Sequence, residues 1–98
     1  MPKKGNKRAR RKFKTTFKMV SPKVKVKKIP EAGVLGYAYQ EDAKIEIDPR
    51  QSSKEFLDTL IHECCHIFLP KLEEKYIEKM ANKIAGIIWS QNFRRIRK

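Results

Sequence analysis

Pro70 divides the C-terminal part of the chain into two stretches, each with the apolar periodicity of a helix. A proline removes a helical hydrogen bond and clashes with the preceding turn, so the first helix must end before it. Ser52 and Glu55 form a capping-box pattern that predicts where this helix begins. Helix-forming residues resume directly after Pro70 and continue to about Asn92. Because the connection is so short, we expect an antiparallel helical hairpin.

The segments that precede the helices have the alternating pattern of half-buried strands. Residues 24–29 alternate apolar side chains with lysine, residues 44–48 alternate isoleucine with charged side chains, and residues 35–39 also favour a strand. A Ser-Pro pair within residues 13–29 indicates a turn there, so this segment can form a basic hairpin. We therefore expect an α+β fold, in which a short antiparallel sheet of two or three strands packs on the helical hairpin.

A chain of 98 residues has room for one domain. Residues 1–12 are nearly all charged or small, and we expect them to form a disordered basic arm. The domain itself is expected to span residues 13–93, and residues 94–98 form a basic tail. Small domains bury a smaller fraction of their surface, so a bound metal ion would be a useful source of stability.

The charge of the chain is unevenly distributed. Residues 1–28 contain 13 of the 24 lysines and arginines and no acidic residue, residues 29–93 carry a net charge of −4, and the tail contributes +4. Such basic ends favour a polyanion, with nucleic acid expected before an anionic membrane surface. The alternative is an arm that only keeps the protein soluble.

The sequence contains neither a secretory signal nor an apolar run long enough to span a membrane. Its two cysteines, Cys64 and Cys65, are neighbours and cannot form an ordinary disulfide framework. A reducing, cytoplasmic location is therefore expected. The oligomeric state cannot be inferred from these features.

His62 and His66 are the only histidines of the chain, and Glu63 directly follows the first of them. Residues four apart lie one above the other on a helix face, so both imidazoles can reach one Zn²⁺ ion. Glu63 can accept a proton from a zinc-bound water and pass it to a leaving amine. The pattern predicts a zinc-dependent hydrolase. The alternatives are two ordinary histidines beside an incidental glutamate, and a bound metal without turnover.

A catalytic zinc usually has three protein ligands and one open position. Without a third histidine, the third ligand must be a glutamate, an aspartate or a cysteine. In the predicted hairpin Glu78 returns to the level of the histidines and is favoured, Glu74 is the alternative and Glu73 ranks third. Each of them can instead be a solvated carboxylate paired with a lysine. Cys65 as a ligand would make the zinc structural, but we expect both cysteines to pack as small apolar residues.

Five further residues lie near the motif or can reach it. Asp58 and Thr59 lie one turn before the histidines, where either can orient an imidazole. Tyr37, Tyr39 and Tyr76 can each supply a phenol to a tetrahedral intermediate. Ordinary polar and packing roles are expected for most of these side chains.

Residues 45–66 resemble the core of small HExxH metallopeptidases, in which a strand precedes an active-site helix of the pattern S-x-x-E-x-x-x-T-L-x-H-E-x-x-H. Residues 78–85 resemble the E-x-x-A-N-x-F-A helix of ImmA/IrrE-type peptidases, with Ile84 in place of phenylalanine. The resemblance covers about residues 35–90 and implies a minimal gluzincin. It implies Glu78 as the third zinc ligand and Glu63 as the catalytic base. Peptidases of this type are linked to the cleavage of regulatory repressors, and so compact a chain suits a phage genome.

The stretch from Leu60 to His66 also resembles SprT-like, Spartan-type peptidases, which are linked to protein adducts on DNA. That family carries a third histidine downstream, which this chain lacks. From both resemblances we expect a zinc metallopeptidase that cleaves a protein associated with nucleic acid. Its substrate peptide can add as a strand beside residues 35–39.

Two other functions are compatible with the same residues. In the first, the zinc only stabilises a helical scaffold, and the basic segments form a nucleic-acid-binding module without catalytic activity. In the second, a metal-dependent hydrolase acts on a bond other than a peptide bond.

Overall fold

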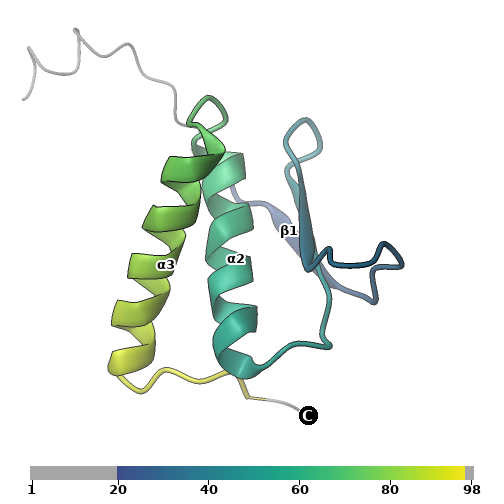
Figure 1. Ribbon diagram of the computed structural model, residues 1–98. Helices are drawn as coiled ribbons and strands as arrows, with labels where there is room; N and C mark the ends of the chain where they lie inside the picture. The colour runs from purple at the N-terminus through teal and green to yellow at the C-terminus, as the bar shows by residue number, and fades with distance from the viewer. Residues whose placement is uncertain (1–19, 97–98) are drawn as a thin grey trace, which may run out of the picture.

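The computed structural model describes residues 20–96, which form a three-stranded open sheet and two helices (Figure 1). In chain order the elements are β1 (Lys23–Val26), β2 (Gly36–Tyr39), β3 (Lys44–Ile47), α2 (Ser53–Phe68) and α3 (Glu74–Ser90). The predicted α+β class is confirmed. The predicted basic arm, the first part of the predicted hairpin at residues 13–19, and residues 97–98 lie outside the described residues. Within residues 20–96, neither helix is long and apolar enough to cross a membrane.

The sheet has the strand order β1-β3-β2 and is mixed, whereas the sequence predicted an antiparallel sheet. β2 is antiparallel to β3, with Gly36 opposite Ile47, and the turn between them includes Ala43 at a positive φ of 49°. β1 pairs with β3 in parallel, so that Val26 also lies beside Ile47. Alternating patterns predict which face of a strand is buried but not its direction, and the connection from β1 to β3 contains β2.

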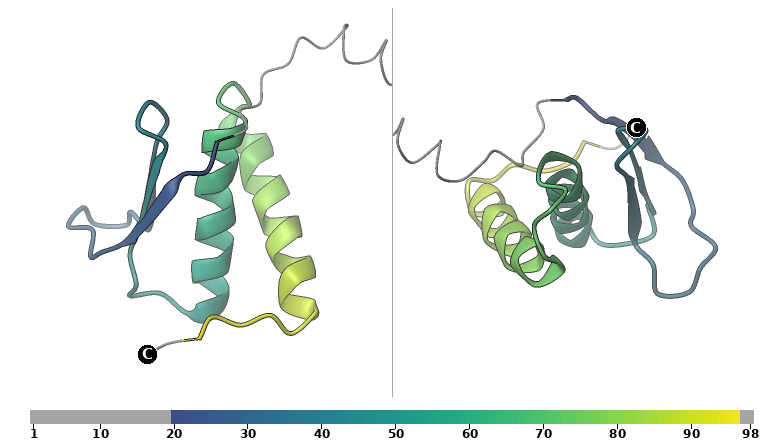
Figure 2. Two further views of the ribbon diagram at one scale, coloured as in Figure 1. Left: turned by 180° about the vertical axis from the view of Figure 1, so that it is seen from behind. Right: turned by 90° about the horizontal axis from the view of Figure 1, so that it is seen from above.

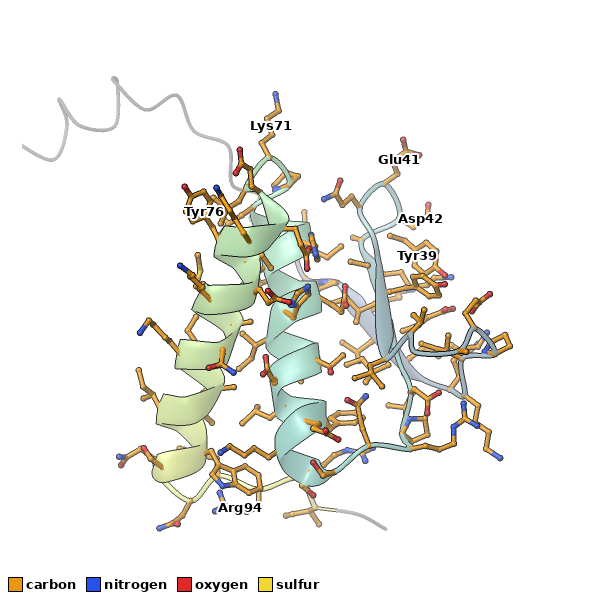
Figure 3. All side chains as sticks on the ribbon, viewed as in Figure 1. Tyr39, Glu41, Asp42, Lys71, Tyr76 and Arg94 are labelled. Carbon is orange, nitrogen blue, oxygen red and sulfur yellow. The ribbon has the colours of Figure 1, made fainter. Side chains whose placement is uncertain are left out.

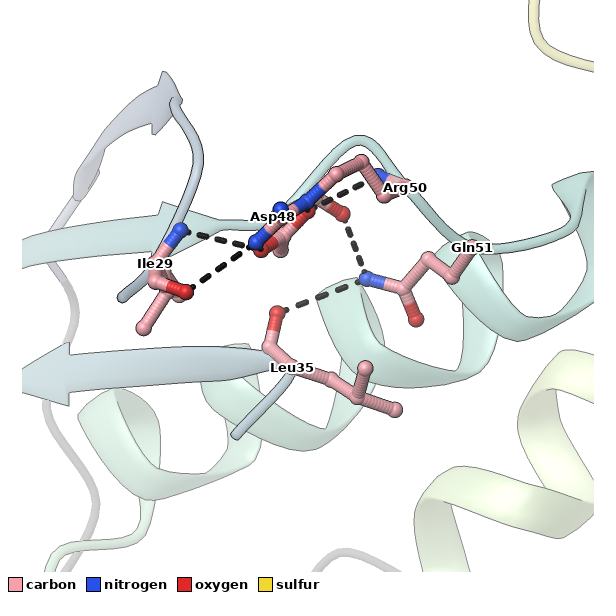
Figure 4. Close-up of polar contacts among 5 residues, drawn as sticks. All are labelled: Ile29, Leu35, Asp48, Arg50 and Gln51. Atoms are coloured by element: carbon pink, nitrogen blue, oxygen red, sulfur yellow. Dashed lines mark hydrogen bonds and ion pairs between the residues drawn. The ribbon is translucent and has the colours of Figure 1, made fainter. Parts of the chain in front are cut away.

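Asp48 anchors the loop between β1 and β2 to the end of β3 (Figure 4). The Ile29 amide donates to Asp48 Oδ2 at 2.9 Å, and the Asp48 amide donates to the Leu35 carbonyl at 2.9 Å. The Arg50 guanidinium lies 2.7 Å from the same Oδ2 and also donates to the Ile29 carbonyl. Arg50, together with the amides of Ile29 and Arg50, holds the pKa of Asp48 well below its usual range. These contacts determine where β2 begins.

Gln51 extends this anchor to the first helix. Its Nε2 donates to the Asp48 carbonyl at 2.7 Å, and its Oε1 accepts a hydrogen bond of 2.9 Å from the Thr59 hydroxyl (the first contact is drawn in Figure 4). The Gln51 side chain is buried away from water. These two hydrogen bonds satisfy both the nitrogen and the oxygen of its amide group. Gln51 therefore fixes α2 relative to the end of β3.

The predicted capping box is present at the start of α2. The Glu55 amide donates to Ser52 Oγ at 3.2 Å, and the Ser52 amide donates to Glu55 Oε1 at 3.1 Å. The helix ends at Phe68, two residues before Pro70, as the sequence predicted. The sequence predicted that helical residues resume at Lys71. α3 begins at Glu74 instead, because residues 71–73 belong to the turn of the hairpin.

α2 is the central element of the fold. It contacts β2 and β3 on one side and α3 on the other, and the three layers are seen from above in Figure 2. The buried core joins the middle strand to this helix through Ile45, Ile47, Phe56 and Ile67. α3 contacts α2 through a face whose buried residues include the small Ala81 and Ala85. Because α2 lies between the sheet and α3, its side chains can contact both of these layers.

Candidate metal centre

His62 and His66 lie one above the other on α2, with ring centroids 5.0 Å apart. Both are partly buried, with side chains that are 20% and 26% exposed. Their Nε2 atoms face one carboxylate of α3: Glu74 Oε2 lies 3.0 Å from His62 Nε2, and Glu74 Oε1 lies 2.8 Å from His66 Nε2. Ligand atoms of the three residues all lie within 4.8 Å of one another. This group could hold a metal ion.

Glu78, the third ligand favoured by the sequence, is not part of this group. It lies one turn further along α3, is exposed, and lines a pocket beside His62. Glu74 lies four residues after Pro70, and His66 lies four residues before it, so the hairpin places these two opposite each other. The structure therefore brings together the histidine pair and the alternative glutamate. Glu73, the third choice, pairs weakly with Lys75 at 3.9 Å.

Glu63 is buried beside the two histidines, with only 8% of the residue exposed. Burial raises the pKa of its carboxyl group, the two imidazoles oppose this shift, and the Glu74 carboxylate adds to it. Within residues 20–96 its carboxylate has no hydrogen-bond or ion-pair partner. It is therefore a buried acidic group that is free to interact with a bound molecule.

Two open pockets meet at Glu63, and both are lined by Gly36, His62 and Glu63. The first, of about 350 Å³, also contains His66 and Glu74. The second, of about 470 Å³, extends toward the other end of α2. Because they share lining residues, the pockets form a cleft along β2, which is an edge strand of the sheet. The histidine motif lies at the centre of this cleft.

Gly36 allows β2 to lie against α2 at this point, a role that the sequence analysis missed. A Cβ atom at this position would lie 2.8 Å from Thr59 Cγ2, 3.1 Å from the Glu46 carbonyl oxygen and 3.2 Å from Glu63 Cγ. A glycine inside a strand often marks such a close approach, so the signal was present in the sequence. The strand can therefore contact the helix at the residue next to His62.

The residues expected to orient the histidines have other hydrogen-bond partners. The Thr59 hydroxyl donates to Gln51, and Asp58 Oδ2 accepts a hydrogen bond of 3.2 Å from Asn82 Nδ2 on α3. The backbone of His66 is instead held by Gln40, whose Nε2 donates to the His66 carbonyl at 2.8 Å. Gln40 lies in the turn between β2 and β3, and no motif in the sequence indicates this contact.

Of the three tyrosines considered as phenol donors, Tyr37 is among the residues that line the pocket with Glu63 and His66. It follows Gly36, whose Cβ would face α2, so the Tyr37 side chain lies on the opposite face of the sheet, where its ring neighbours Tyr39. The Tyr39 hydroxyl donates to Glu46 Oε1 at 3.1 Å, and Tyr76 is exposed on α3 (both are labelled in Figure 3). None of these three phenols therefore lies beside Glu63.

The two cysteines are not part of the possible metal group. Cys65 is buried, and Cys64 is partly buried and packs against the core. Burial raises the pKa of both thiols, which disfavours the thiolate form that binds metals. Both therefore have the packing role expected from the sequence.

Two groups of basic side chains lie at other parts of the described chain. On the edge strand β1, every residue is exposed, including its two lysines. At the end of the helical hairpin opposite Lys71, the Arg94 guanidinium lies 3.5 Å from the Trp89 ring centroid (Figure 3). Arg95 stacks in the same way on Phe56, at 4.3 Å.

Comparisons with models of protein families, with curated proteins and with solved structures find no match for this chain. The functional interpretation therefore depends on the geometry of the cleft and on the chemistry of its residues.

Proposed function

We propose that this protein is a zinc-dependent peptidase in which His62, His66 and Glu74 bind the metal and Glu63 is the general base. The observation that carries the proposal is the convergence of two imidazole Nε2 atoms on one carboxylate, beside a second carboxylate that has no partner within residues 20–96. The resemblance of residues 45–66 to HExxH metallopeptidases supports the same chemistry.

The three donor atoms suit a catalytic zinc site. Two imidazole nitrogens and one glutamate oxygen form a known ligand set for such sites, and ligand atoms at about 2.0–2.1 Å from a tetrahedral zinc lie about 3.3 Å from one another. Small adjustments of Glu74, whose side chain is 59% exposed, would bring the group to this spacing. Zinc bound there would polarise the substrate carbonyl and lower the pKa of a water molecule.

Glu63 supplies the proton transfers. It lies next to His62 on the helix and lines both parts of the cleft, so it can accept a proton from an attacking water molecule. The same carboxyl group then donates this proton to the nitrogen of the leaving amine.

The substrate is proposed to be an extended peptide that pairs with β2. Within residues 20–96 this strand pairs with β3 on one side and with no strand on the other, and Gly36, Tyr37 and Ala38 line the cleft. An added strand gains main-chain hydrogen bonds and places alternate side chains in pockets. In this arrangement the scissile bond would lie above Glu63.

Metal analysis and a matched variant test the proposal. The purified protein should contain close to one zinc per chain and should hydrolyse casein or a peptide library. Glu63→Gln should keep the zinc but lower turnover by about 10²–10⁴-fold, the range expected for loss of a general base. His62→Ala should lose both the metal and the activity. The proposal fails if the protein binds no zinc, or if Glu63→Gln hydrolyses peptides as fast as the parent.

A second function, binding of nucleic acid, is favoured by the distribution of charge. Residues 1–28 contain 13 basic residues and no acidic one, and the lysines of β1 are exposed at the edge of the sheet. We propose that these groups bring the protein to nucleic acid, where a bound protein is a suitable substrate. If binding were the only function, the parent protein would show no peptide hydrolysis, and Glu63→Gln would bind nucleic acid as the parent does.

A further inference from the structure

Two polar contacts connect α2 with α3, and Glu78 lies between them along α3. Glu74 contacts the histidine pair near the hairpin turn, and Asn82 donates to Asp58 two helical turns further along. Glu78 is four residues from each of these α3 residues and is exposed. Within residues 20–96 it has neither a hydrogen bond nor an ion pair. The unpaired carboxylate of Glu78 therefore lies between two residues of α3, Glu74 and Asn82, that each contact α2.

The larger part of the cleft, which we call the Glu78 pocket, is strongly acidic. This pocket of about 470 Å³ is lined by the carboxylates of Asp58, Glu63 and Glu78, by His62 and by residues 33–36. None of its described lining residues is a lysine or an arginine. A zinc ion bound at His62 would largely compensate the charges of Glu63 and Glu74, whereas Asp58 and Glu78 leave a negative potential that attracts a positively charged group.

The spacing of these carboxylates favours an organic cation over a second metal ion with three protein ligands. In residues 20–96, donor atoms of three possible ligands approach within 4.8 Å of one another only in the group of His62, His66 and Glu74. An ammonium or guanidinium group presents several N–H donors and can bridge acceptors that are further apart. Val34 and Leu35, which also line the pocket, can contact the aliphatic part of such a side chain.

Glu63 gives independent evidence that a ligand belongs here. Only 8% of the Glu63 residue is exposed, and the loss of hydration of a carboxylate is normally recovered through a hydrogen bond or an ion pair. Within the described chain Glu63 has no such partner, and its side chain lines the Glu78 pocket. A main-chain N–H of a peptide bound in the cleft would satisfy Glu63 and leave Asp58 and Glu78 to bind a side chain of that peptide.

We propose that the Glu78 pocket binds a lysine or arginine side chain of the substrate, close to the scissile bond. The inference rests on the proposed peptidase function, because this pocket adjoins the motif and shares Gly36, His62 and Glu63 with its other part. Glu78 and Asp58 bind the cation and set the specificity, whereas Glu63 acts in the chemical step.

Matched peptides test the proposal. We would compare kcat/KM for peptides that differ only by lysine, arginine, norleucine or glutamate at each position around the cleavage site. One position should favour lysine and arginine over norleucine by about fivefold or more, the effect of a well-formed ion pair. Glu78→Gln should lose most of this preference. Glu41→Gln, which removes the same charge at the tip of the β2–β3 turn (Figure 3), should retain it.

Peptide binding to the Glu63→Gln variant separates this inference from the proposed function. If no peptide is cleaved, but the lysine peptide binds more tightly than the norleucine peptide and Glu78→Gln removes the difference, the cation pocket is correct and the peptidase proposal is wrong. If peptides are cleaved without any preference for a basic residue, the pocket assignment is wrong. A preference that Glu78→Gln leaves unchanged would also overturn it.

Discussion

His66 and Glu74 face each other across the turn of the helical hairpin, with Nε2 and Oε1 2.8 Å apart. Each lies four residues from Pro70, so the position of the proline in the sequence sets which acidic residue meets the histidines. Glu74 can reach both imidazoles because its two carboxylate oxygens contact one ring each.

Glu74→Gln is expected to lower zinc affinity by more than about 100-fold, because an amide is a far weaker zinc ligand than a carboxylate. Glu78→Gln should change the affinity by less than about threefold. Competition with a chromophoric chelator would measure both values. If Glu78→Gln lost the metal and Glu74→Gln kept it, the third ligand would be Glu78, and the cation pocket would lose its central residue.

Gly36→Ala is expected to destabilise the fold and to reduce activity. The added methyl group would lie 2.8 Å from Thr59 Cγ2 and 3.1 Å from a backbone oxygen, so β2 must move away from α2. Overpacking of this kind costs about 1–3 kcal/mol. Chemical denaturation would measure the loss, and kcat/KM would report the displacement of Glu63.

Gly86→Ala is the matched control for this substitution. It lies within α3, and a Cβ atom there would have no neighbour within 4 Å. Replacing a glycine inside a helix by alanine stabilises by roughly 0.5–1 kcal/mol. The two substitutions should therefore change stability in opposite directions. Equal effects would contradict the close contact between β2 and α2.

Nucleic-acid binding is expected to weaken steeply with salt. A protein that makes 6–10 phosphate contacts loses about 10³–10⁵ in affinity between 50 and 200 mM salt. Binding of the full chain to a short duplex, followed by fluorescence anisotropy, should show this behaviour. A double substitution of Lys23 and Lys25 to glutamine should reduce the salt slope by up to about 2.

The matched control for the β1 lysines is a double substitution of Lys79 and Lys83 to glutamine. Both are exposed on α3, on the other side of α2 from the sheet (Figure 2). If β1 contacts the phosphates, this control substitution should leave the salt dependence of nucleic-acid affinity nearly unchanged. Equal effects of the two pairs would indicate that only total charge matters, and salt-independent binding would exclude the electrostatic mode.

Local patterns accounted for much of this fold. The capping box of Ser52 and Glu55, the helix end before Pro70 and the alignment of the two histidines all depend on residues within one turn of each other. Such features follow from helix geometry alone. The same is true of the antiparallel pairing of β2 with β3, which are joined by a short turn.

Features that depend on contacts between distant segments were not predictable. The parallel pairing of β1, the hydrogen bond from the Ile29 amide to the Asp48 carboxylate and the contact of Gly36 with α2 each join residues far apart in the sequence. The choice between Glu74 and Glu78 depends on how many residues the hairpin turn uses. The pattern of apolar residues permits either choice, because both glutamates lie on the same face of α3.

Asp48 is expected to make the stability of the protein depend on pH. Arg50 and two backbone amides lower the pKa of its carboxyl group in the folded state below the ordinary value of about 3.9. Folding therefore favours the carboxylate, and its stabilising contribution is fully present above this ordinary value. The contribution is lost as the pH falls from about 4 toward the lowered pKa of the folded state.

Thermal melts of the parent protein and Asp48→Asn between pH 2 and pH 7 would measure this contribution. At pH 7 the variant should melt several degrees lower, because 1 kcal/mol corresponds to about 4–8 °C for a domain of this size. The difference between the two melting temperatures should stay constant down to about pH 5 and shrink below pH 4. Glu41→Gln, in an exposed turn, should follow the parent throughout. A difference that persisted unchanged to pH 2 would show that Asp48 acts through its shape and hydrogen bonds rather than its charge.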